Sequence, residues 1–434
     1  MTDDDNQWAA LWPLDPAVAF LNHGSYGACP REILRHQAEL RAEMEAEPVR
    51  FLGRDLDDRL DAARARLAAF VGADADDLAF VSNATGGVNA VLRSLRFEPG
   101  DELLTTDHSY QACRNTLDFV AARTGARVVT VTLPFPLTSP QAIVDTVLAG
   151  ATARTRLCLL DHITSPTALV LPIERLVAAL AARGIDTVVD GAHAPGMVPL
   201  DLRAIGAAYY SGNCHKWLCT PKGSAFLWVR GDRQAAIHPL TISHGAKGER
   251  AGRTRFRLEF DWTGTQDPTA WLTVPMAIDY LAGLVPGGWP ALMARNRALA
   301  LEARRLLCDA VGTPPPCPEE MIGSIASVSL PDNRTVEKGW RVRDPLQGRL
   351  FEGWGIEVPI MRWPAPPRRL IRVSAQLYNR RSQYARLADA LRKELPGDRG
   401  EGRADRVVVR LQVGPGTGGS GGHGKALLPQ VYTM

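Results

Sequence analysis

Short apolar runs alternate with amphipathic helical patterns along most of this chain, from about residue 54 to residue 395. Apolar runs that are this short and separated by helices are typical of buried parallel strands joined by crossover helices. Strands are predicted in this way at 78–81, 127–133, 156–160, 185–190 and 224–229. The pattern therefore predicts an α/β fold built on a largely parallel sheet.

Amphipathic helices are predicted between and after these strands. Residues 54–71 place apolar side chains on one face and stop at Gly72, and residues 173–183 repeat the pattern. The alternation of short apolar runs and helical patterns ends at about residue 275. A long helical pattern follows and leads into a proline-rich break at 314–318. The later elements are predicted as a helix at 291–311, strands at 324–330 and 369–374, and a helix at 382–395.

These changes divide the chain into four expected segments. The final stretch contains VGPGTGGSGGHG, and its glycine and serine content predicts a flexible tail. The expected segments are an N-terminal segment at 1–20, a large α/β domain at 21–275, a smaller α+β domain at 276–395 and the tail at 396–434.

Charge and cysteine usage exclude several classes of function. The 50 basic and 47 acidic side chains leave a net charge of +3, which argues against nucleic acid or an anionic membrane as partner. No apolar run is long enough to span a bilayer, and the acidic N-terminus lacks a signal-like apolar core. The seven scattered cysteines contain no CxxC pair, so neither a disulfide framework nor a metal site is expected. A cytoplasmic location follows from this usage.

Two polar segments near the predicted strands carry candidate chemistry. Lys216 lies in the run SGNCHKW, which a surface turn would also explain. Asp190 directly follows a predicted strand, at the edge where open α/β sheets place ligands, although an aspartate there could simply cap the next segment. Because one strand-loop-strand unit separates them, the sheet could bring both residues to the same edge.

A third segment, NATGGVN at 83–89, lies between a predicted strand and the next helix. Small residues at a helix N-terminus expose backbone N–H groups to an anion, and Thr85 adds a hydroxyl. A tight connection without a ligand is the alternative interpretation. The run matches neither the Gly-Lys-Ser/Thr phosphate loop nor the GxGxxG dinucleotide loop.

Together the three segments supply what pyridoxal 5′-phosphate (PLP) requires. The cofactor needs an amine for its imine, a carboxylate for its pyridine nitrogen and a cradle for its phosphate. The carboxylate keeps the ring nitrogen protonated, and a partly desolvated, cationic site lowers the pKa of the lysine that must attack the aldehyde.

The lysine segment NCHKWLCTPKG at 213–223 resembles that of the class V aminotransferase-fold enzymes, in particular the isopenicillin N epimerase-like branch. The resemblance covers about residues 18 to 395 and implies a PLP-dependent transferase of fold type I. That fold has a large, mixed, mostly parallel sheet domain and a smaller α+β C-terminal domain. The other matching runs are FLNHGSYG at 20–27, DHSY at 107–110, DHITS at 161–165, DGAH at 190–193, WTGTQD at 262–267 and RVSAQLYN at 372–379.

The resemblance also implies roles for individual residues. Lys216 would form the internal aldimine and move the α-proton, Asp190 would pair with the pyridine nitrogen, and His193 would lie near the phenolic oxygen. Further cofactor contacts are implied for Thr85, Gly86, Tyr110 (stacked on the ring), Ser165, Asn213, His215, Thr263 and Thr265. Substrate contacts are implied for Asn22, His23 and Arg372.

Two of these implied roles have consequences for assembly and binding. Thr263 and Thr265 resemble a segment that reaches the phosphate of the neighbouring subunit, which implies a homodimer with shared active sites. Arg372 would clamp the α-carboxylate of an amino-acid substrate, although Arg368 and Arg369 lie close by in the sequence.

Loss of the α-proton from a PLP-bound amino acid gives a quinonoid intermediate, and the sequence does not decide which reaction follows from it. The leading interpretation is epimerisation or β-elimination with C–S cleavage, and the second is class V transamination. A PLP-fold protein without turnover and a nucleotide-binding α/β protein are alternatives from other classes. A cysteine desulfurase is disfavoured, because residues 354–372 contain no cysteine ahead of Arg372.

Overall fold

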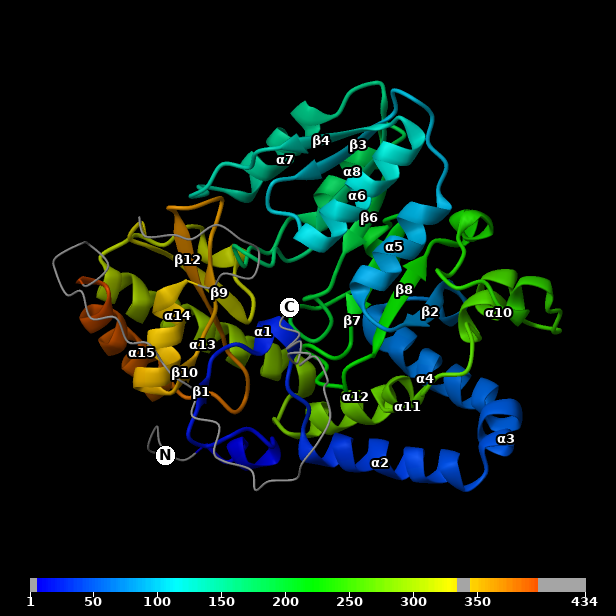
Figure 1. Cartoon of the computed structure of the whole chain (residues 1–434), viewed down its shortest axis with the longest axis horizontal. Coiled ribbons are helices and arrows are strands. Elements are labelled where there is room, and N and C mark those ends of the chain that lie inside the picture. The colour runs from blue at the N-terminus through cyan, green and yellow to red at the C-terminus, as the bar shows by residue number, and fades with distance from the viewer. Residues whose placement is uncertain (1–5, 334–343, 397–434) are drawn as a thin grey trace, which may run out of the picture.

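The computed structural model describes residues 6–333 and 344–396 and is built around a seven-stranded sheet of order β2-β8-β7-β6-β5-β3-β4 (Figure 1). β8 is antiparallel to both of its neighbours, and the remaining adjacent pairs are parallel. The prediction of a mixed, mostly parallel sheet is therefore confirmed. The strands are β2 (Leu78–Val81), β3 (Glu102–Thr106), β4 (Arg127–Val131), β5 (Thr155–Asp161), β6 (Asp186–Asp190), β7 (Tyr209–Asn213) and β8 (Ala225–Val229).

Five of these strands fall where the apolar runs predicted them, whereas β3 and β7 were not predicted. β7 has the sequence YYSGN, so its second half lacks the apolar side chains that signal a buried strand. The strand is nevertheless fully buried because its small residues allow close packing. A side chain at Gly212 would lie 2.7 Å from the ring of Phe226 and 2.8 Å from Pro195.

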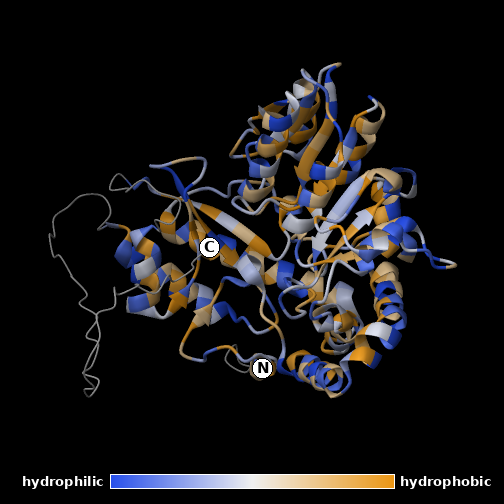
Figure 2. Cartoon of the chain, turned by 45° about the vertical axis from the view of Figure 1, so that its right-hand side comes forward, coloured by the Kyte–Doolittle hydropathy of each residue, from blue (hydrophilic) through white to orange (hydrophobic). Residues whose placement is uncertain are grey.

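Helices cover both faces of the sheet, and its apolar strands lie between them (Figure 2). α5, α6 and α10 contribute to the apolar core on one face, and α4, α7 and α8 contribute to the core on the other. The helices up to residue 283 are α1 (His23–Tyr26), α2 (Arg31–Ala46), α3 (Pro48–Arg50), α4 (Leu56–Val71), α5 (Ala84–Ser94), α6 (Gln111–Thr124), α7 (Pro140–Gly150), α8 (Ile173–Ala181), α9 (Leu202–Ile205), α10 (Arg255–Asp261), α11 (Thr269–Leu272) and α12 (Val274–Gly283).

The smaller C-terminal domain lies beside the large sheet (Figure 1). Its three-stranded antiparallel sheet has the order β11-β12-β9, and the long helix α13 packs against β9 and α15. The first strand of the chain, β1, pairs in parallel with β10, close to the end of the fold. These elements are β1 (Ala19–Phe20), α13 (Gly288–Val311), β9 (Ile325–Leu330), α14 (Pro345–Trp354), β10 (Ile356–Glu357), β11 (Ile360–Met361), β12 (Arg369–Ser374) and α15 (Arg381–Glu394).

The predicted elements after residue 275 agree closely with these bounds. The strand predicted at 369–374 coincides with β12, and the helix predicted at 291–311 begins three residues earlier, at Gly288. The predicted tail lies outside the described residues, except for Pro396.

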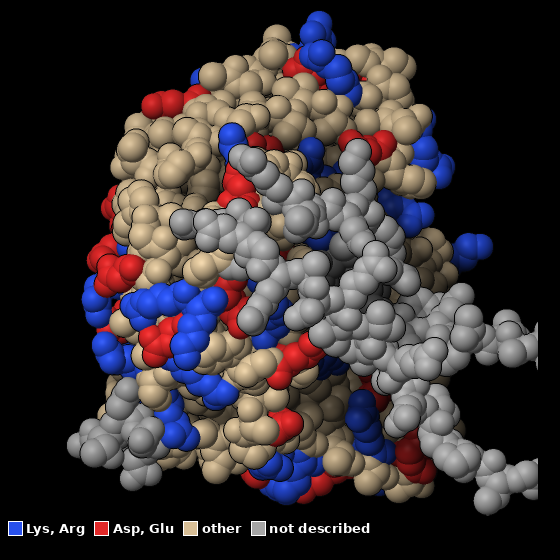
Figure 3. Space-filling model, turned by 60° about the vertical axis from the view of Figure 1, so that its left-hand side comes forward, with Lys and Arg blue, Asp and Glu red and all other residues tan. Residues whose placement is uncertain are grey.

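Acidic and basic side chains are interspersed on the face shown in Figure 3. Within the described ranges, no helix has both the length and the apolar character that a membrane crossing requires.

Candidate active site

Lys216 lies in the turn between β7 and β8, at the carboxyl end of the parallel strands. Its Nζ is 3.1 Å from Nε2 of His193, which follows β6. Burial lowers the pKa of the Lys216 amine to about 8, and the nearby guanidinium of Arg372 acts in the same direction. A larger share of this amine is therefore unprotonated at neutral pH than for an ordinary lysine.

The tautomer of His193 follows from its second partner. Its Nδ1 lies 3.4 Å from Nε1 of Trp217, and an indole N–H can only donate. Burial holds the pKa of the His193 imidazole well below its usual value, so the ring is neutral and carries its proton on Nε2. Nε2–H therefore points its proton at the Lys216 nitrogen and favours a neutral amine there.

Replacing Trp217 by phenylalanine tests this role of the indole. The variant keeps an aromatic ring but frees His193 to adopt the other tautomer, which would direct a lone pair rather than a proton at Nζ. We expect the rate of imine formation at neutral pH to fall about five-fold, the scale of one lost hydrogen bond. Stopped-flow absorbance after mixing with PLP across a pH series measures this, and an unchanged pH profile would contradict the tautomer assignment.

Asp190 ends β6, as the sequence predicted, and it is almost fully buried. Oδ1 accepts the backbone N–H of Ala192 at 3.0 Å, and Oδ2 accepts the thiol of Cys113 at 3.1 Å. Asp161 ends the neighbouring strand β5 in register with Asp190, and it accepts the N–H of Tyr110 at 3.1 Å. Burial raises the pKa of both carboxyls, and their mutual repulsion raises that of Asp161 further.

The N-terminus of α5 lies beside the lysine segment. The side chain of Asn213 accepts the N–H of Ala84 at 2.8 Å, and the side chain of Asn83 accepts the N–H of Gly86 at 2.8 Å. The N–H and hydroxyl of Thr85 have no protein partner among the described residues. Because Thr85 is only half-buried and its N–H is unpartnered among the described residues, this first turn can accept an anion.

The close approach of α5 to the sheet depends on a glycine. A Cβ at Gly87 would lie 2.2 Å from the hydroxyl oxygen of Ser211 on β7, a distance that no real side chain adopts. A Cβ at Gly86 would meet nothing closer than 3.5 Å. The second glycine of the Gly-Gly pair therefore brings the helix against the strand that leads to Lys216.

Arg372 lies on β12 and is 1% exposed. Its Nη1 donates to the carbonyl oxygen and the hydroxyl of Ser165 at 2.6 and 3.0 Å, and its Nη2 donates to Ser25 at 3.0 Å. Across the described residues it contacts no carboxylate, and its Nε has no hydrogen-bond partner. Burial lowers its pKa to about 10, so the group stays cationic at neutral pH.

The segment 22–27, which consists of the short helix α1 and its two capping residues, joins Arg372 to the lysine turn. Asn22 accepts the hydroxyl of Ser25 at 2.6 Å, and Nε2 of His23 donates to the carbonyl oxygen of Lys216 at 3.0 Å. Gly27 has a φ of 71°, and a Cβ there would lie 2.0 Å from the carbonyl oxygen of His215. The segment 22–27 is thus fitted closely against the lysine segment, and only glycine is tolerated at its end.

The remaining predicted residues differ in how closely they join this cluster. Tyr110 precedes α6 with 44% of its surface exposed, and its position is fixed by Asp161. His215 is partly buried, with Nδ1 bonded to the carbonyl oxygen of Ser224. Thr263 and Thr265 lie in the segment between α10 and α11, where Thr263 accepts a hydrogen bond from Gln266. In the described part of the chain, neither threonine forms a hydrogen bond with Lys216.

Sequence reasoning did not assign four residues that the structure places in this network. Asp161, Ser25 and Trp217 lie in runs that match the family, but no role was predicted for them, and Cys113 lies outside those runs. Asp161 carried a detectable signal, since it directly follows the strand predicted at 156–160. Nothing in the sequence indicates that Cys113, on a separate helix, reaches Asp190.

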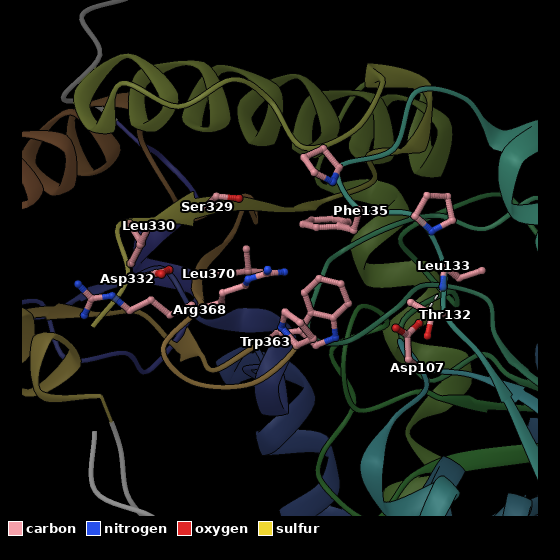
Figure 4. Close-up of a pocket in the computed structure, with 14 residues that line it drawn as sticks. Asp107, Thr132, Leu133, Phe135, Ser329, Leu330, Asp332, Trp363, Arg368 and Leu370 are labelled. Atoms are coloured by element: carbon pink, nitrogen blue, oxygen red, sulfur yellow. Dashed lines mark hydrogen bonds between the residues drawn. The ribbon is translucent and has the colours of Figure 1, made fainter. Parts of the chain in front are cut away.

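A separate cavity of about 400 Å³ lies between the large sheet and the small domain (Figure 4). Phe135 and Trp363 line it with ring centroids 4.8 Å apart, and both pack against His108. Leu330 and Leu370 of the small domain line the cavity as well. The cavity does not include Lys216, Asp190 or Arg372.

In the described part of the chain, no group of three or more metal-binding side chains comes together, and all seven cysteines are buried free thiols.

Comparison with known proteins identifies the family. The sequence model of the class-V aminotransferases matches residues 28–310. Isopenicillin N epimerase of Streptomyces clavuligerus is 38% identical over 392 residues, which cover 87% of this chain and 95% of that protein. A probable chloroplastic L-cysteine desulfhydrase of Arabidopsis thaliana is 32% identical over 404 residues, covering 87% of this chain and 83% of that protein.

Solved structures show the same fold at low sequence identity. The cysteine desulfurase CsdA from Escherichia coli superposes with a TM-score of 0.72 at 22% identity, covering 90% of this chain and 98% of that one. The cystine C–S lyase C-DES gives a TM-score of 0.69 at 20% identity, covering 86% and 97%. This chain belongs to the class V aminotransferase family and has the fold of the type I PLP-dependent enzymes.

PLP is the cofactor of this family, and the residues present fit it. A buried amine of lowered pKa, a buried carboxylate and a helix N-terminus with an unpartnered N–H meet at one sheet edge. The chain is accordingly a PLP-dependent enzyme, with the amine of Lys216 as the group suited to hold the cofactor covalently.

Proposed function

We propose that this chain removes the α-proton of an amino acid and epimerises that carbon. The observation that carries the proposal is the 38% identity to isopenicillin N epimerase along 95% of that relative. A second candidate reaction is β-elimination with C–S cleavage from a sulfur-containing amino acid. The desulfhydrase of Arabidopsis thaliana, 32% identical over 404 residues, supports this second reaction.

An amino acid is the substrate class that suits the cation at the site. The Arg372 guanidinium is buried and bonded only to neutral oxygens of Ser165 and Ser25. Burying a cation without a counter-charge is costly, so a carboxylate that reaches it would be bound strongly and in a fixed orientation. We propose that the α-carboxylate of the substrate takes this place, beside Asn22 and His23.

Proton transfer at the α-carbon falls to Lys216. PLP, when bound, supplies the electron sink that stabilises the charge left on the α-carbon. A lysine amine with a pKa of about 8 can accept that proton near neutral pH. Inversion of the α-carbon then requires that a proton be delivered to the face opposite Lys216. His193, with its Nε2–H directed at the amine, keeps the nitrogen oriented, and Asp190 would hold a charge opposite the ring nitrogen.

The phosphate is proposed to lie at the N-terminus of α5, against Thr85 and Gly86, with Asn213 and His215 alongside. Tyr110 would cover one face of the ring, next to Ser165. Thr263 and Thr265 are proposed to serve the phosphate of a partner subunit, which requires a homodimer. Sedimentation at the mass of one 47.2 kDa chain, with full cofactor affinity, would contradict that arrangement.

Isotope exchange separates the two candidate reactions. The purified PLP-loaded protein is incubated in D₂O with a panel of L- and D-amino acids, including L-cysteine. Deuterium at the α-carbon together with loss of optical rotation is expected for the epimerase, and release of pyruvate and sulfide for the lyase. Turnover that depends on an added keto acid would instead identify an aminotransferase and overturn the proposal.

A further inference from the structure

Ionising both of the buried carboxyls at the ends of β5 and β6 is unfavourable, because burial raises the pKa of each and charge on Asp190 raises that of Asp161 further. Asp161 and Asp190 are register partners on adjacent parallel strands and are 2% and 4% exposed. Two like charges this close in a buried site share one proton, and the environment decides which carboxyl keeps it. The titratable groups that face the pair are Tyr110, which precedes α6, Cys113 from α6, Tyr210 from β7 and Lys216 from the turn after β7.

The two carboxyls differ in their hydrogen-bond donors. Asp190 receives two from separate groups, the Ala192 N–H at 3.0 Å and the Cys113 thiol at 3.1 Å, one on each oxygen. Among the described residues, Asp161 receives only the N–H of Tyr110, shared between its oxygens at 3.1 and 3.4 Å. Donors stabilise the ionised form of a carboxyl, so the extra donor favours charge on Asp190.

Cys113 is the only one of these donors that belongs to a side chain, since the other two are backbone N–H groups. It is fully buried on α6, and its burial and the adjacent negative charges raise the pKa of its thiol well above the usual value. The thiol therefore keeps its hydrogen and remains a donor throughout the physiological range.

We propose that the Cys113 thiol, by donating its S–H to Oδ2 of Asp190, fixes the negative charge of this carboxyl pair on Asp190 and leaves the proton on Asp161. Cys113 is thus a positioning residue that acts through Asp190. The inference rests on the proposed pairing of Asp190 with the ring nitrogen of PLP, because it is there that the fixed charge matters.

The experiment compares the affinities for PLP and for its analogue with carbon in place of the ring nitrogen. Both dissociation constants are measured from pH 5 to 9 by quenching of tryptophan fluorescence, and their ratio cancels the contributions of Lys216 and of the phosphate. The preference for PLP requires ionised Asp190, so it falls as the pH drops through the pKa of Asp190. Removing the donor raises that pKa, so Cys113→Ala should move the fall to higher pH by about one unit, a tenfold change in preference there.

Two further cysteine variants make the test specific. Cys113→Ser keeps a hydroxyl donor and should restore the wild-type profile to within about 0.3 of a pH unit. Cys158→Ala removes another fully buried thiol, on β5, which has no polar partner among the described residues, and should leave the profile unchanged. A Cys113→Ala profile equal to that of the wild type, or a Cys113→Ser profile shifted as far as that of Cys113→Ala, overturns the inference.

Two aspartate variants keep the outcome decisive. Asp161→Asn mimics the protonated carboxyl and should retain the wild-type profile even if Cys113→Ala does not fold, whereas a lost preference would place the charge on Asp161 and overturn the inference. Asp190→Asn should abolish the preference for PLP at every pH. If it does not, the pairing of Asp190 with the ring nitrogen is wrong; if it does while Cys113→Ala has no effect, only the role of Cys113 fails.

Discussion

Lys216→Ala is expected to abolish the imine absorption band of the PLP-loaded protein and its borohydride-reducible adduct. The reason is chemical, since the amine of Lys216 is the group that the structure places beside His193 and Asp190 with a pKa lowered to about 8. Catalysis through this residue should fall by at least the 10²–10⁴-fold typical of a lost proton-transfer group, on the order of what a general base contributes. Spectrophotometry, and peptide mapping after reduction, measure the result.

Lys222 provides a matched control in the same segment. Its Nζ donates to the carbonyl oxygen of Gly27 at 3.0 Å, and burial lowers its pKa as well, so it is the neighbouring lysine most able to react. Lys222→Ala should keep the reducible adduct at position 216. Recovery of the cofactor on Lys222 from the wild-type protein would contradict the assignment.

Arg372→Ala should weaken the binding of every amino-acid substrate. Removing a buried cation that pairs with a charged ligand costs about 2–5 kcal/mol, which corresponds to about thirty-fold or more in apparent affinity. Cofactor binding should change much less, because Arg372 is proposed to contact the substrate and not PLP. Titration with amino acids, followed by the change in the visible spectrum, gives both quantities on one sample.

The adjacent arginines supply the controls. Arg368 is exposed, so Arg368→Ala should leave amino-acid affinity close to that of the wild type. Arg369 is buried and pairs with buried Asp344 at 2.8 Å, so its loss should reduce thermal stability rather than selectively weaken substrate binding. Equal substrate affinity in the Arg372→Ala and Arg368→Ala variants would contradict the proposed carboxylate site.

Most of the sheet was predictable because its strands are apolar on both faces. β5, β6 and β8 are buried from both sides and read as continuous apolar runs, which places Asp190 at a strand end. β7 escaped prediction because packing against Phe226 requires glycine, which weakens the strand signal. The order of the strands, with β8 antiparallel on both sides, is a tertiary property that no local pattern encodes.

The candidate site was predictable where one segment carries its own signal. Lys216, Asp190 and Arg372 could be predicted as candidates because their runs follow strands or match a known family. The donor that reaches Asp190 from Cys113 depends on how α6 packs over the sheet, and the tautomer of His193 depends on the indole of Trp217. Such contacts join segments that only the folded chain brings together.

The pairing of β1 with β10 has a mechanical consequence. The N–H of Leu21 donates to the carbonyl oxygen of Glu357 at 3.0 Å, and its carbonyl oxygen accepts the N–H of Ser374 at 2.9 Å. Two residues later, Nε2 of His23 donates to the carbonyl oxygen of Lys216. The segment that begins with β1 is therefore hydrogen-bonded to the small domain at one end and to the lysine turn at the other. Arg372 lies on β12 of the same small domain, so one short segment of chain links the proposed carboxylate site to the backbone at Lys216.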